Sequence, residues 1–361
     1  MNKLACFHIL NDYSGSPKVL KNILGGLLQR GVKIDLLTSC GGVLDELKTE
    51  KGITLSQYNF KFSENQFIYL IKFLFIQIYI FFFSFKYLFA KKIVFYINTI
   101  MPVGAAFAGR IMCKKVVYHY HENTFKSTFY ELLAKIMQML ATEIICVSDY
   151  QRSFLSRKHG VTVIPNALPD EFCKQFTPKA EKSFEQKTVL MLSSLKKYKG
   201  AVEFIELAQR LPQYNFELVI NDTDENIQTF LERNNIKKTE NLKIYERQDN
   251  VVKFYQRAAL VLNLSDKNLF VETFGMTALE AMTAGLPVIV PTVGGIAELV
   301  KNDINGYKID VCELEEIEIQ IDEILSDHIL YQKLSSNALK TAKEYDNKIA
   351  VDKILQIIEK K

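Results

Sequence analysis

Short apolar strands alternate with helical segments along the whole chain, and the alternation runs twice with a break in between. The break is the segment 165–187, which holds three prolines and mixed charge without a sustained period, as a linker does. Strands that alternate with helices predict a parallel sheet covered by helices on both faces. The chain is therefore expected to be an α/β protein of two doubly wound domains that face a central cleft, with ligands at the carboxyl ends of the strands.

The 361 residues suffice for two ordinary domains. The expected organisation is a first domain at 1–168, a linker at 169–187, a second domain at 188–343, and a C-terminal helix at 344–361 that can return to the first domain. The expected strands are 4–9, 32–37, 53–58, 93–98, 115–120, 143–147, 161–164, 188–194, 216–220, 242–245, 260–264, 287–290 and 306–309. The expected helices are 18–30, 66–88, 102–112, 126–140, 149–157, 200–211, 224–234, 249–258, 275–284, 312–326, 328–343 and 347–360.

Positive charge is concentrated in the first half of the chain. Residues 1–170 hold 20 Lys and Arg against 11 Asp and Glu, and residues 171–361 hold 25 against 30, so the halves carry +9 and −5. A basic half predicts an anionic partner, and the phosphates of a lipid surface or of a lipid-linked acceptor would serve. Nucleic acid is not expected, because the sequence contains no basic and aromatic reader motif.

The six cysteines lie far apart and form no C-x-x-C pair. They predict buried thiols in a reducing cytosol rather than disulfides or metal ligands. The first residues lead straight into a strand-like run and lack the apolar length and cleavage site of a signal peptide. We therefore expect a cytoplasmic protein, with peripheral contact at the inner face of the cell membrane as a further expectation.

The segment 67–92 is strongly apolar and aromatic. Lys72 and Lys86 leave thirteen uncharged residues between them, fewer than the about 18–20 that a bilayer span requires. Three placements remain open: a helix packed on the sheet, a helix that also enters the interface of an anionic membrane with its lysines near phosphates, and a true span.

The stretch "ETFGMTALEAMTAGLPVIV", Glu272 to Val290, combines a helical pattern with two carboxylates. A helix that begins near Phe274 presents unpaired N–H groups, which with the helix dipole suit a diphosphate. Gly275 lets a phosphate approach the backbone. Glu272 and Glu280 could accept hydrogen bonds from sugar hydroxyls and from a ribose diol on either side. The plain alternative is that Glu272 lies near a helix cap and that Glu280 lies on a solvated helix face.

The E-x7-E spacing, followed by "EAMTAGLPVIV" and by "GGIAELV" at 294–300, resembles the donor site of family 4 (group 1) retaining glycosyltransferases of the GT-B fold. Three further stretches extend the resemblance over nearly the whole chain: "YSGSPKVLKNILGGLLQRGVKIDLLT" at 13–38, "VIPNAL" at 163–168 and "LSSLKKYKG" at 192–200. The resemblance implies two Rossmann-like domains, with the acceptor bound by the first and a nucleotide-sugar donor by the second.

The resemblance also implies roles for residues of the second domain. Glu272 would face the donor sugar and Glu280 the ribose. Lys199 matches the family lysine on the diphosphate, where an ammonium can neutralise a leaving phosphate. The backbone at the start of the helix would bind the phosphates, at Phe274, Gly275, Met276 and Thr277.

In the first domain, "VVYHYHENT" at 116–124 ends a strand with two histidines. His121 matches the family histidine that faces the donor sugar, and we expect His119 on the opposite side of the strand. Gly15 and Ser16 match the glycine loop near the donor phosphate. The alternatives are a structural histidine at the strand end, and a turn and helix N-cap at Gly15 and Ser16.

Two departures from the family pattern stand out. Ser193-Ser194-Leu195 replaces Gly-Arg-Leu, so the phosphate-binding arginine is absent at Ser194 and only Lys196 or Lys197 could substitute for it. Asn221 stands where a glycine often follows the strand. The nearby Asp222-Thr223-Asp224 resembles a metal site of another fold, but Asp222 or Asp224 as a helix N-cap is the plainer interpretation. No metal and no other cofactor is expected, because the helix terminus and Lys199 supply positive potential.

These observations predict a retaining hexosyltransferase that moves a sugar from a nucleoside diphosphate sugar to an acceptor hydroxyl, in bacterial surface polysaccharide or glycolipid synthesis. A non-catalytic nucleotide-sugar-binding subunit and a sugar-nucleotide epimerase of related architecture remain alternatives. A nicotinamide dehydrogenase is not expected, because no G-x-G-x-x-G follows the first strand. The donor's base and sugar, the acceptor, the linkage and the oligomeric state stay open.

Overall fold

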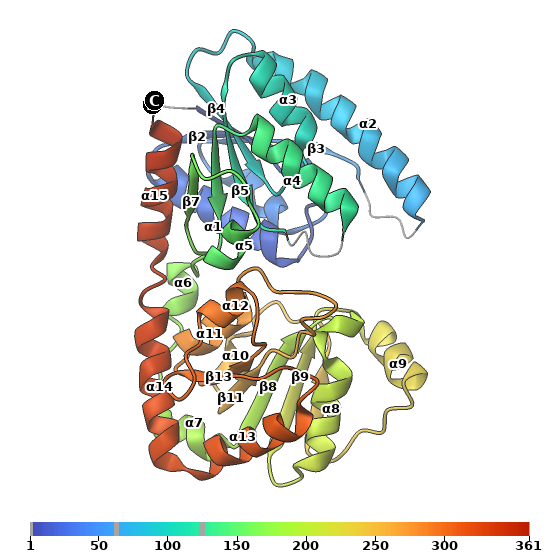
Figure 1. Cartoon of the computed structure of the whole chain (residues 1–361), viewed down its shortest axis with the longest axis vertical. Helices are drawn as coiled ribbons and strands as arrows, with labels where there is room; N and C mark the ends of the chain where they lie inside the picture. Colours follow the sequence, from blue (N-terminus) through green and yellow to red (C-terminus); the bar gives the residue numbers. More distant parts are fainter. Residues whose placement is uncertain (1–2, 61–64, 123–126, 361) are drawn as a thin grey trace. The chain divides into compact units, whose positions relative to one another are not determined.

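The structure is a computed structural model and describes residues 3–60, 65–122 and 127–360. The chain divides into two compact units, Met1–Ala167 with Asn347–Lys361, and Leu168–Asp346. Each unit is built on a parallel sheet with helices on its faces (Figure 1). The doubly wound α/β class that the alternation predicts is confirmed.

Within the described residues, the sheet of the first unit has seven parallel strands in the order β3-β2-β1-β4-β5-β6-β7. The strands are β1 (Lys3–Phe7), β2 (Lys33–Ser39), β3 (Ile53–Tyr58), β4 (Ile93–Asn98), β5 (Lys115–Tyr120), β6 (Glu143–Cys146) and β7 (Val161–Val163). All residues of β4 are buried, as expected for a central strand that is covered on both faces. Each strand predicted for this half of the chain is present.

Helices cover both faces of this sheet. On one face lie α2 (Gln66–Ser84), α3 (Val103–Ile111) and α4 (Thr128–Leu140), and Phe73, Phe95 and Leu133 belong to the core beneath them (Figure 1). On the other face, α1 (Gly15–Gln29) packs closely against α15 (Asn347–Glu359), since a side chain at Gly26 would approach Val351 to 2.7 Å. The shorter helices of this unit are η1 (Val43–Thr49), η2 (Phe85–Tyr87) and α5 (Asp149–Ser153).

The apolar segment predicted at 67–92 forms α2 and packs on the sheet side of the first unit. Phe73, Ile76 and Ile80 are buried in the core. The Gly104 N–H of α3 donates a hydrogen bond to Gln77 Oε1 at 2.9 Å, which ties the two helices together. The placement of this helix on the fold is therefore the first of the three that the sequence leaves open.

By length and composition alone, the stretch Phe67–Tyr87 could also cross a membrane, and it is the one such helix among the described residues. The count of thirteen uncharged residues understates this length, because a span tolerates a lysine. The buried side of α2 nevertheless belongs to a folded core, which a core helix and a span would use differently.

In the second unit, the sheet of the described residues has six parallel strands in the order β10-β9-β8-β11-β12-β13. The strands are β8 (Thr188–Ser193), β9 (Asn215–Ile220), β10 (Leu242–Tyr245), β11 (Leu260–Leu262), β12 (Val288–Val290) and β13 (Gly306–Lys308). The chain builds outward from β8 to β10 and then crosses to the other side of β8 for β11 to β13. Ligands of such sheets bind at the carboxyl ends of the strands beside this reversal.

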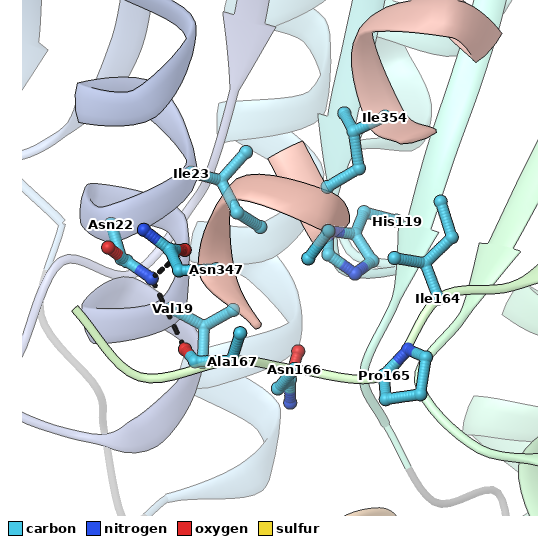
Figure 2. Close-up of a pocket in the computed structure, with 11 residues that line it drawn as sticks. Val19, Asn22, Ile23, His119, Ile164, Pro165, Asn166, Ala167, Asn347 and Ile354 are labelled. Carbon is cyan, nitrogen blue, oxygen red and sulfur yellow. Dashed lines mark hydrogen bonds between the residues drawn. The ribbon is translucent and has the colours of Figure 1, made fainter. Parts of the chain in front are cut away.

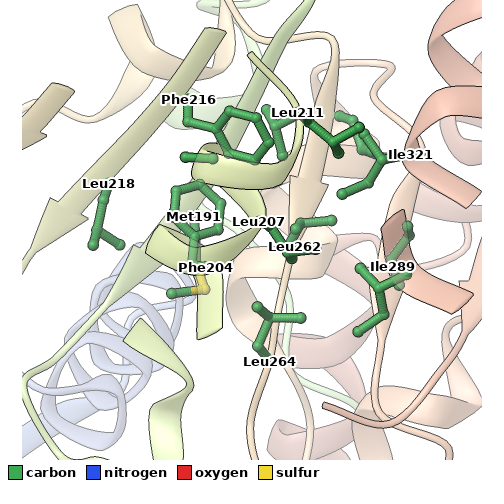
Figure 3. Close-up of a cluster of buried hydrophobic side chains, with 14 of the residues drawn as sticks. Met191, Phe204, Leu207, Leu211, Phe216, Leu218, Leu262, Leu264, Ile289 and Ile321 are labelled. Atoms are coloured by element: carbon green, nitrogen blue, oxygen red, sulfur yellow. The ribbon is translucent and has the colours of Figure 1, made fainter. Parts of the chain in front are cut away.

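The helices of the second unit enclose this sheet. They are α6 (Asp170–Cys173), α7 (Ala180–Gln186), η3 (Lys197–Lys199), α8 (Ala201–Arg210), α9 (Asp224–Arg233), α10 (Val252–Tyr255), α11 (Met276–Thr283), α12 (Gly295–Glu298), α13 (Leu314–Ser326) and α14 (His328–Ala342). Figure 3 shows part of the core, in which Phe204 of α8 and Ile321 of α13 join Met191, Phe216 and Ile289 of the strands. This core holds the loops of the candidate site on rigid strands.

Some predicted elements differ from the structure. The segment predicted as a linker at 169–187 carries α6 and α7, and α7 packs against α14 within the second unit. Its prolines restrict it to short helices, so no sustained period marks them. The helix predicted at 126–140 begins at Thr128, and Lys126 lies outside the described residues. The helix predicted at 249–258 shortens to Val252–Tyr255.

Candidate functional site

Three loops meet at the carboxyl ends of β8, β11 and β12. The loop after β8 lies against the loop after β11, since a side chain at Gly200 would meet the Leu264 carbonyl oxygen at 2.4 Å. The loop after β12 lies against the same segment, since a side chain at Gly294 would meet the Glu272 carbonyl oxygen at 2.5 Å. Both glycines also have positive φ angles, 74° and 112°, which disfavour other residues. Glu272 is therefore fixed beside the reversal point of the sheet.

Glu272 is held as an ionised carboxylate. Its Oε1 forms an ion pair with Lys199 Nζ and accepts a hydrogen bond from Ser265 Oγ at 2.9 Å. Burial alone would raise the pKa of Glu272, but the charge of Lys199 and hydrogen bonds from Lys199, Ser265 and Asn263 hold that pKa below its ordinary value. The structure thus brings together Glu272 and Lys199, two residues that the sequence singles out separately.

Helix α11 begins at Met276 rather than near Phe274, with Thr277 in its first turn. Its N-cap is Gly275, which has no side chain to accept hydrogen bonds from the first N–H groups. An α-helix leaves these N–H groups without partners inside the helix, and the dipole adds positive potential there. The amino end of α11 can therefore bind an anionic group.

Gly275 and Phe274 each have a structural reason that the sequence does not reveal. Gly275 has a φ of 100°, and a side chain there would meet Ile296 Cγ1 at 2.4 Å, so conformation and packing both require glycine. The Phe274 ring is buried and packs edge-on against Tyr345, with ring centroids 5.8 Å apart. Only the backbone of these two residues therefore remains for a phosphate.

Glu280 lies inside α11, partly buried rather than on an open helix face. Its Oε2 accepts a hydrogen bond from the Tyr255 hydroxyl at 2.5 Å. Burial, and then the charge of Glu280, raise the pKa of Tyr255 well above its ordinary value, so the phenol keeps its proton and donates it. Sequence reasoning missed Tyr255, because nothing local distinguishes it from a core aromatic residue of α10.

Asp310 is a second residue that sequence reasoning missed. It follows β13 and is buried. It accepts hydrogen bonds from the Thr292 N–H at 3.0 Å and the Thr292 hydroxyl at 2.9 Å, and it forms an ion pair with Lys267. Burial would raise the pKa of Asp310, but these contacts hold it below its ordinary value. Asp310 thus joins the loop after β12 to the loop after β11, and a lone aspartate after a strand carries no motif that could reveal this.

No arginine is present where the family pattern places one. Ser193 Oγ donates a hydrogen bond to the Ser194 carbonyl at 3.2 Å, and the flanking Lys196 and Lys197 are exposed. Because Lys199 is already paired with Glu272, an incoming phosphate would have to draw its ammonium away from that carboxylate.

The Asp-Thr-Asp stretch caps a helix, but through its middle residue. Thr223 is the N-cap of α9, and its hydroxyl accepts a hydrogen bond from the Asn226 N–H at 3.4 Å. Asp222 supports the turn through its Oδ1, which accepts from the Asn226 amide at 2.6 Å. At the neighbouring strand ends, Arg247 Nε donates to Asn221 Oδ1 at 2.8 Å, so Asn221 has a partner that glycine could not supply.

In the first unit, His121 follows β5 and belongs to a hydrogen-bonded chain. His121 Nε2 lies 3.0 Å from Asn98 Oδ1, and the Asn98 amide nitrogen lies 3.1 Å from His8 Nδ1. Because an amide oxygen can only accept, His121 donates through Nε2, and Asn98 in turn donates to His8. Burial, and then the charges of His119 and His8, lower the pKa of His121 well below its ordinary value, so it is neutral near pH 7.

The expectation that His119 points away from His121 is wrong. Residues two apart in a strand share a face, and the two rings lie 4.1 Å apart between centroids. His119 Nδ1 lies 2.7 Å from the Tyr96 hydroxyl. Its Nε2 and Asn166 Oδ1 are buried without a hydrogen-bond partner among the described residues, and both residues line a cavity of about 10 Å³ (Figure 2). That volume suits a single water molecule, so His119 has a structural place.

Gly15 is the first residue of α1, and Ser14 rather than Ser16 is the N-cap, without a side-chain capping bond. A side chain added at Gly15 would meet nothing within 4 Å. Neither packing nor a positive φ therefore requires glycine there, unlike at Gly275. The open space is consistent with a ligand that approaches this end of α1.

Comparison with known families matches residues 174–341 to the family described as glycosyl transferases group 1. The chain also resembles solved structures over its full length. Anabaena Alr3699/HepE, solved in complex with UDP and glucose, superposes with a TM-score of 0.78 at 19% identity and 100% coverage of both chains. WaaG, a glycosyltransferase involved in lipopolysaccharide biosynthesis, gives 0.73 at 18% identity, covering 99% of this chain and 100% of WaaG. The fold is therefore GT-B, and the second unit carries a group 1 glycosyltransferase domain.

Matches to curated relatives are shorter. The N-acetyl-alpha-D-glucosaminyl L-malate synthase of Bacillus anthracis is 26% identical over 45% of this chain and 42% of the relative. A sucrose synthase of Melioribacter roseus is 40% identical over 24% of this chain and 12% of the relative. The poly(glycerol-phosphate) alpha-glucosyltransferase of Bacillus subtilis is 29% identical over 43% and 22%. The matched segments thus span less than half the length of these relatives.

Proposed function

We propose that this protein is a retaining glycosyltransferase that moves a hexose from a nucleoside diphosphate sugar to an acceptor hydroxyl. The observation that carries the proposal is the ion pair of Glu272 and Lys199 beside the uncapped amino end of α11. Its position, at the reversal point of the sheet, is where ligands of this fold class bind. The family match over residues 174–341 supports the same reaction class.

Each polar group of the second unit has a proposed part in this reaction. The first N–H groups of α11 and the Lys199 ammonium stabilise the departing diphosphate. The ionised Glu272 accepts hydrogen bonds from donor-sugar hydroxyls. Glu280, oriented by Tyr255, accepts from the ribose diol. Because these groups supply the positive potential themselves, the scheme works without a metal ion.

His121 is proposed to orient the sugar. Its Nε2 is engaged by Asn98, and burial keeps the ring neutral near pH 7. A neutral imidazole whose Nε2 carries the proton presents Nδ1 as an acceptor for a hydroxyl.

For the acceptor, we propose a surface polysaccharide or glycolipid at the inner face of the cell membrane. The support is the basic first half of the chain and the fold likeness to WaaG, a glycosyltransferase involved in lipopolysaccharide biosynthesis.

A thermal-shift screen of nucleoside diphosphates and their sugars tests donor binding. A cognate donor at about 100 times its Kd stabilises the protein by about 2.7 kcal/mol, which is expected to raise Tm by about 5–10 °C. The free diphosphate should give part of this shift, and the free sugar none. A panel in which no nucleotide changes Tm would contradict the proposed site.

A non-catalytic nucleotide-sugar-binding subunit is the second candidate function. Two observations favour it: Ser194 replaces the family arginine, and Glu272 already neutralises Lys199. A donor that raises Tm but releases no nucleoside diphosphate with any candidate acceptor would support this alternative. Conversion of the donor to an epimeric sugar nucleotide without acceptor would instead support an epimerase.

Gly15→Leu is expected to weaken donor binding or transfer by about tenfold or more without lowering Tm. The new side chain has open space in the structure, and leucine favours a helix over glycine by about 1 kcal/mol. Gly25→Leu is the matched control, because Gly25 lies in the same helix and is equally free of neighbours within 4 Å. Equal activity of the two variants would remove Gly15 from the donor site.

A further inference from the structure

The side of α2 that faces away from the sheet is as apolar as the buried side. Phe67, Phe75 and Phe82 are 71%, 69% and 67% exposed. They recur at intervals that place them along one stripe of the helix. The other exposed large apolar residues of α2 and of the turn after it are Ile68, Leu70, Ile71, Leu74, Ile78, Tyr79, Leu88 and Phe89. We call these eleven residues the α2 face, and a continuous exposed patch of this kind marks an interaction surface.

The charge around the α2 face has a single sign. From Asn65 to His121 the sequence contains seven Lys and Arg and no Asp or Glu. Lys86 lies beside the end of α2, with its Nζ 3.9 Å from the centre of the Phe83 ring. Lys114 Nζ donates hydrogen bonds to the carbonyls of Leu88 and Ala90, so it lies against the turn that follows the helix.

A depression near the carboxyl end of α2 collects more of this charge. Its volume is about 330 Å³, and Arg110, Lys114 and Lys115 line it together with Cys113 and Thr142. Because Lys114 contacts the turn after α2, this depression adjoins the α2 face. An apolar surface that ends in a basic depression has the chemistry of a lipid surface with anionic headgroups.

We propose that α2 lies flat in the interface of an anionic membrane, with the α2 face among the upper acyl chains and Arg110 and the neighbouring lysines on lipid phosphates. This surface goes beyond sugar transfer and does not depend on it. It would bring the first unit to a lipid surface whether or not the acceptor is a lipid.

The other two occupants fit less well. A span would have to strip Phe73, Ile76 and Ile80 from the core and break the Gln77–Gly104 contact between α2 and α3. A second copy, related by a two-fold axis, would present the same patch to itself. It would set lysines against lysines in a segment that has no acid to compensate them.

The chain contains no tryptophan, so a single introduced tryptophan reports on its own surroundings. In Phe67→Trp, Phe75→Trp and Phe82→Trp, vesicles of phosphatidylglycerol and phosphatidylethanolamine are expected to shift emission to the blue. Quenching by brominated lipids should then place all three indoles at one shallow depth. Ile329→Trp, 80% exposed on α14, is the matched control and should not shift. A deep indole at Phe75→Trp between two shallow ones would show a span and overturn the proposal, as would three unshifted indoles.

Flotation with the same vesicles tests the charge. The bound fraction is expected to fall about tenfold in Phe75→Asp and about fivefold for each charge removed in Lys91→Glu and Arg110→Glu. Phosphatidylcholine vesicles and high salt should also release the protein. Ile329→Asp and Lys237→Glu are controls from the second unit and should float like the wild type. If the wild type ignores vesicles but is a dimer that Phe75→Asp makes monomeric, the occupant is a second copy and the proposal fails.

Discussion

Glu272→Gln is expected to lower sugar transfer by about 10- to 100-fold while the nucleoside diphosphate still binds. A hydrogen bond to a charged group is worth about 1.5–3 kcal/mol, and the amide removes the charge from the carboxylate that would face the donor sugar. It also leaves Lys199 without its ion-pair partner, so the ammonium becomes available to a phosphate. We therefore expect kcat to fall with little loss of diphosphate affinity, measured by steady-state kinetics and by calorimetric titration of the diphosphate.

Two comparisons separate this role from a structural one. Glu316→Gln changes an exposed glutamate of α13 and should leave transfer and Tm unchanged. Lys199→Met combined with Glu272→Gln should lose less than the sum of the two single variants, because each single change strands a partly buried charge. Wild-type turnover in Glu272→Gln would refute the assigned role, whatever the other variants show.

Glu280→Gln is the parallel change on the other side of α11, and its effect should fall on nucleotide affinity. The Tyr255 hydroxyl can still donate to the amide oxygen, so the side chain keeps its position. The affinity for a nucleoside diphosphate is expected to drop about tenfold, since one charged acceptor is lost. Unchanged affinity in a titration would separate Glu280 from the ribose.

The sheets could be predicted from the sequence because their signal is local. A buried parallel strand is a short apolar run between turns, and each such run became a strand. The short helices α6, α7 and α12 were not predicted, because four to seven residues cannot establish a helical period. What holds α7 is its packing on α14, which lies far along the chain.

The same distinction applies to the candidate site. Glu272, Gly275 and Glu280 lie on one continuous loop and helix, so their spacing alone places them together. Tyr255 and Asp310 reach the site from other strands, and nothing in their neighbours announces them. The error at His119 has a different origin: the alternation of a strand places residues two apart on the same face, and it was applied with the wrong sign.

Acidification from pH 7 to pH 5 is expected to destabilise the first unit by about 2 kcal/mol for each buried neutral histidine. Burial lowers the pKa of His8 to about 4 and that of His119 to about 3, against about 6.5 in an unfolded chain. Between these values the unfolded chain takes up protons and the folded chain does not. The stability is therefore fully present above about pH 6.5 and falls as the pH drops toward the folded pKa values.

Glu122 opposes this trend. Burial raises the pKa of its carboxyl to about 7, although it accepts hydrogen bonds from the N–H groups of Ile100 and His121. The folded state therefore binds a proton that the unfolded state lacks between about pH 7 and pH 4.5, which adds stability as the pH falls. His121, whose pKa burial also lowers, acts with His8 and His119. Three histidines against one carboxyl make the net change a loss of stability.

His119→Asn isolates one of these groups. The loss of unfolding free energy between pH 7 and pH 5, measured in urea, is expected to be about 2 kcal/mol smaller in this variant than in the wild type. His328→Asn is the matched control, since His328 is exposed at the start of α14, and it should keep the wild-type loss. An unchanged loss in His119→Asn would mean that the ring does not stay neutral in the folded state. Because both proteins keep Glu122 and every other acid, the difference between their pH dependences reports proton uptake at one imidazole.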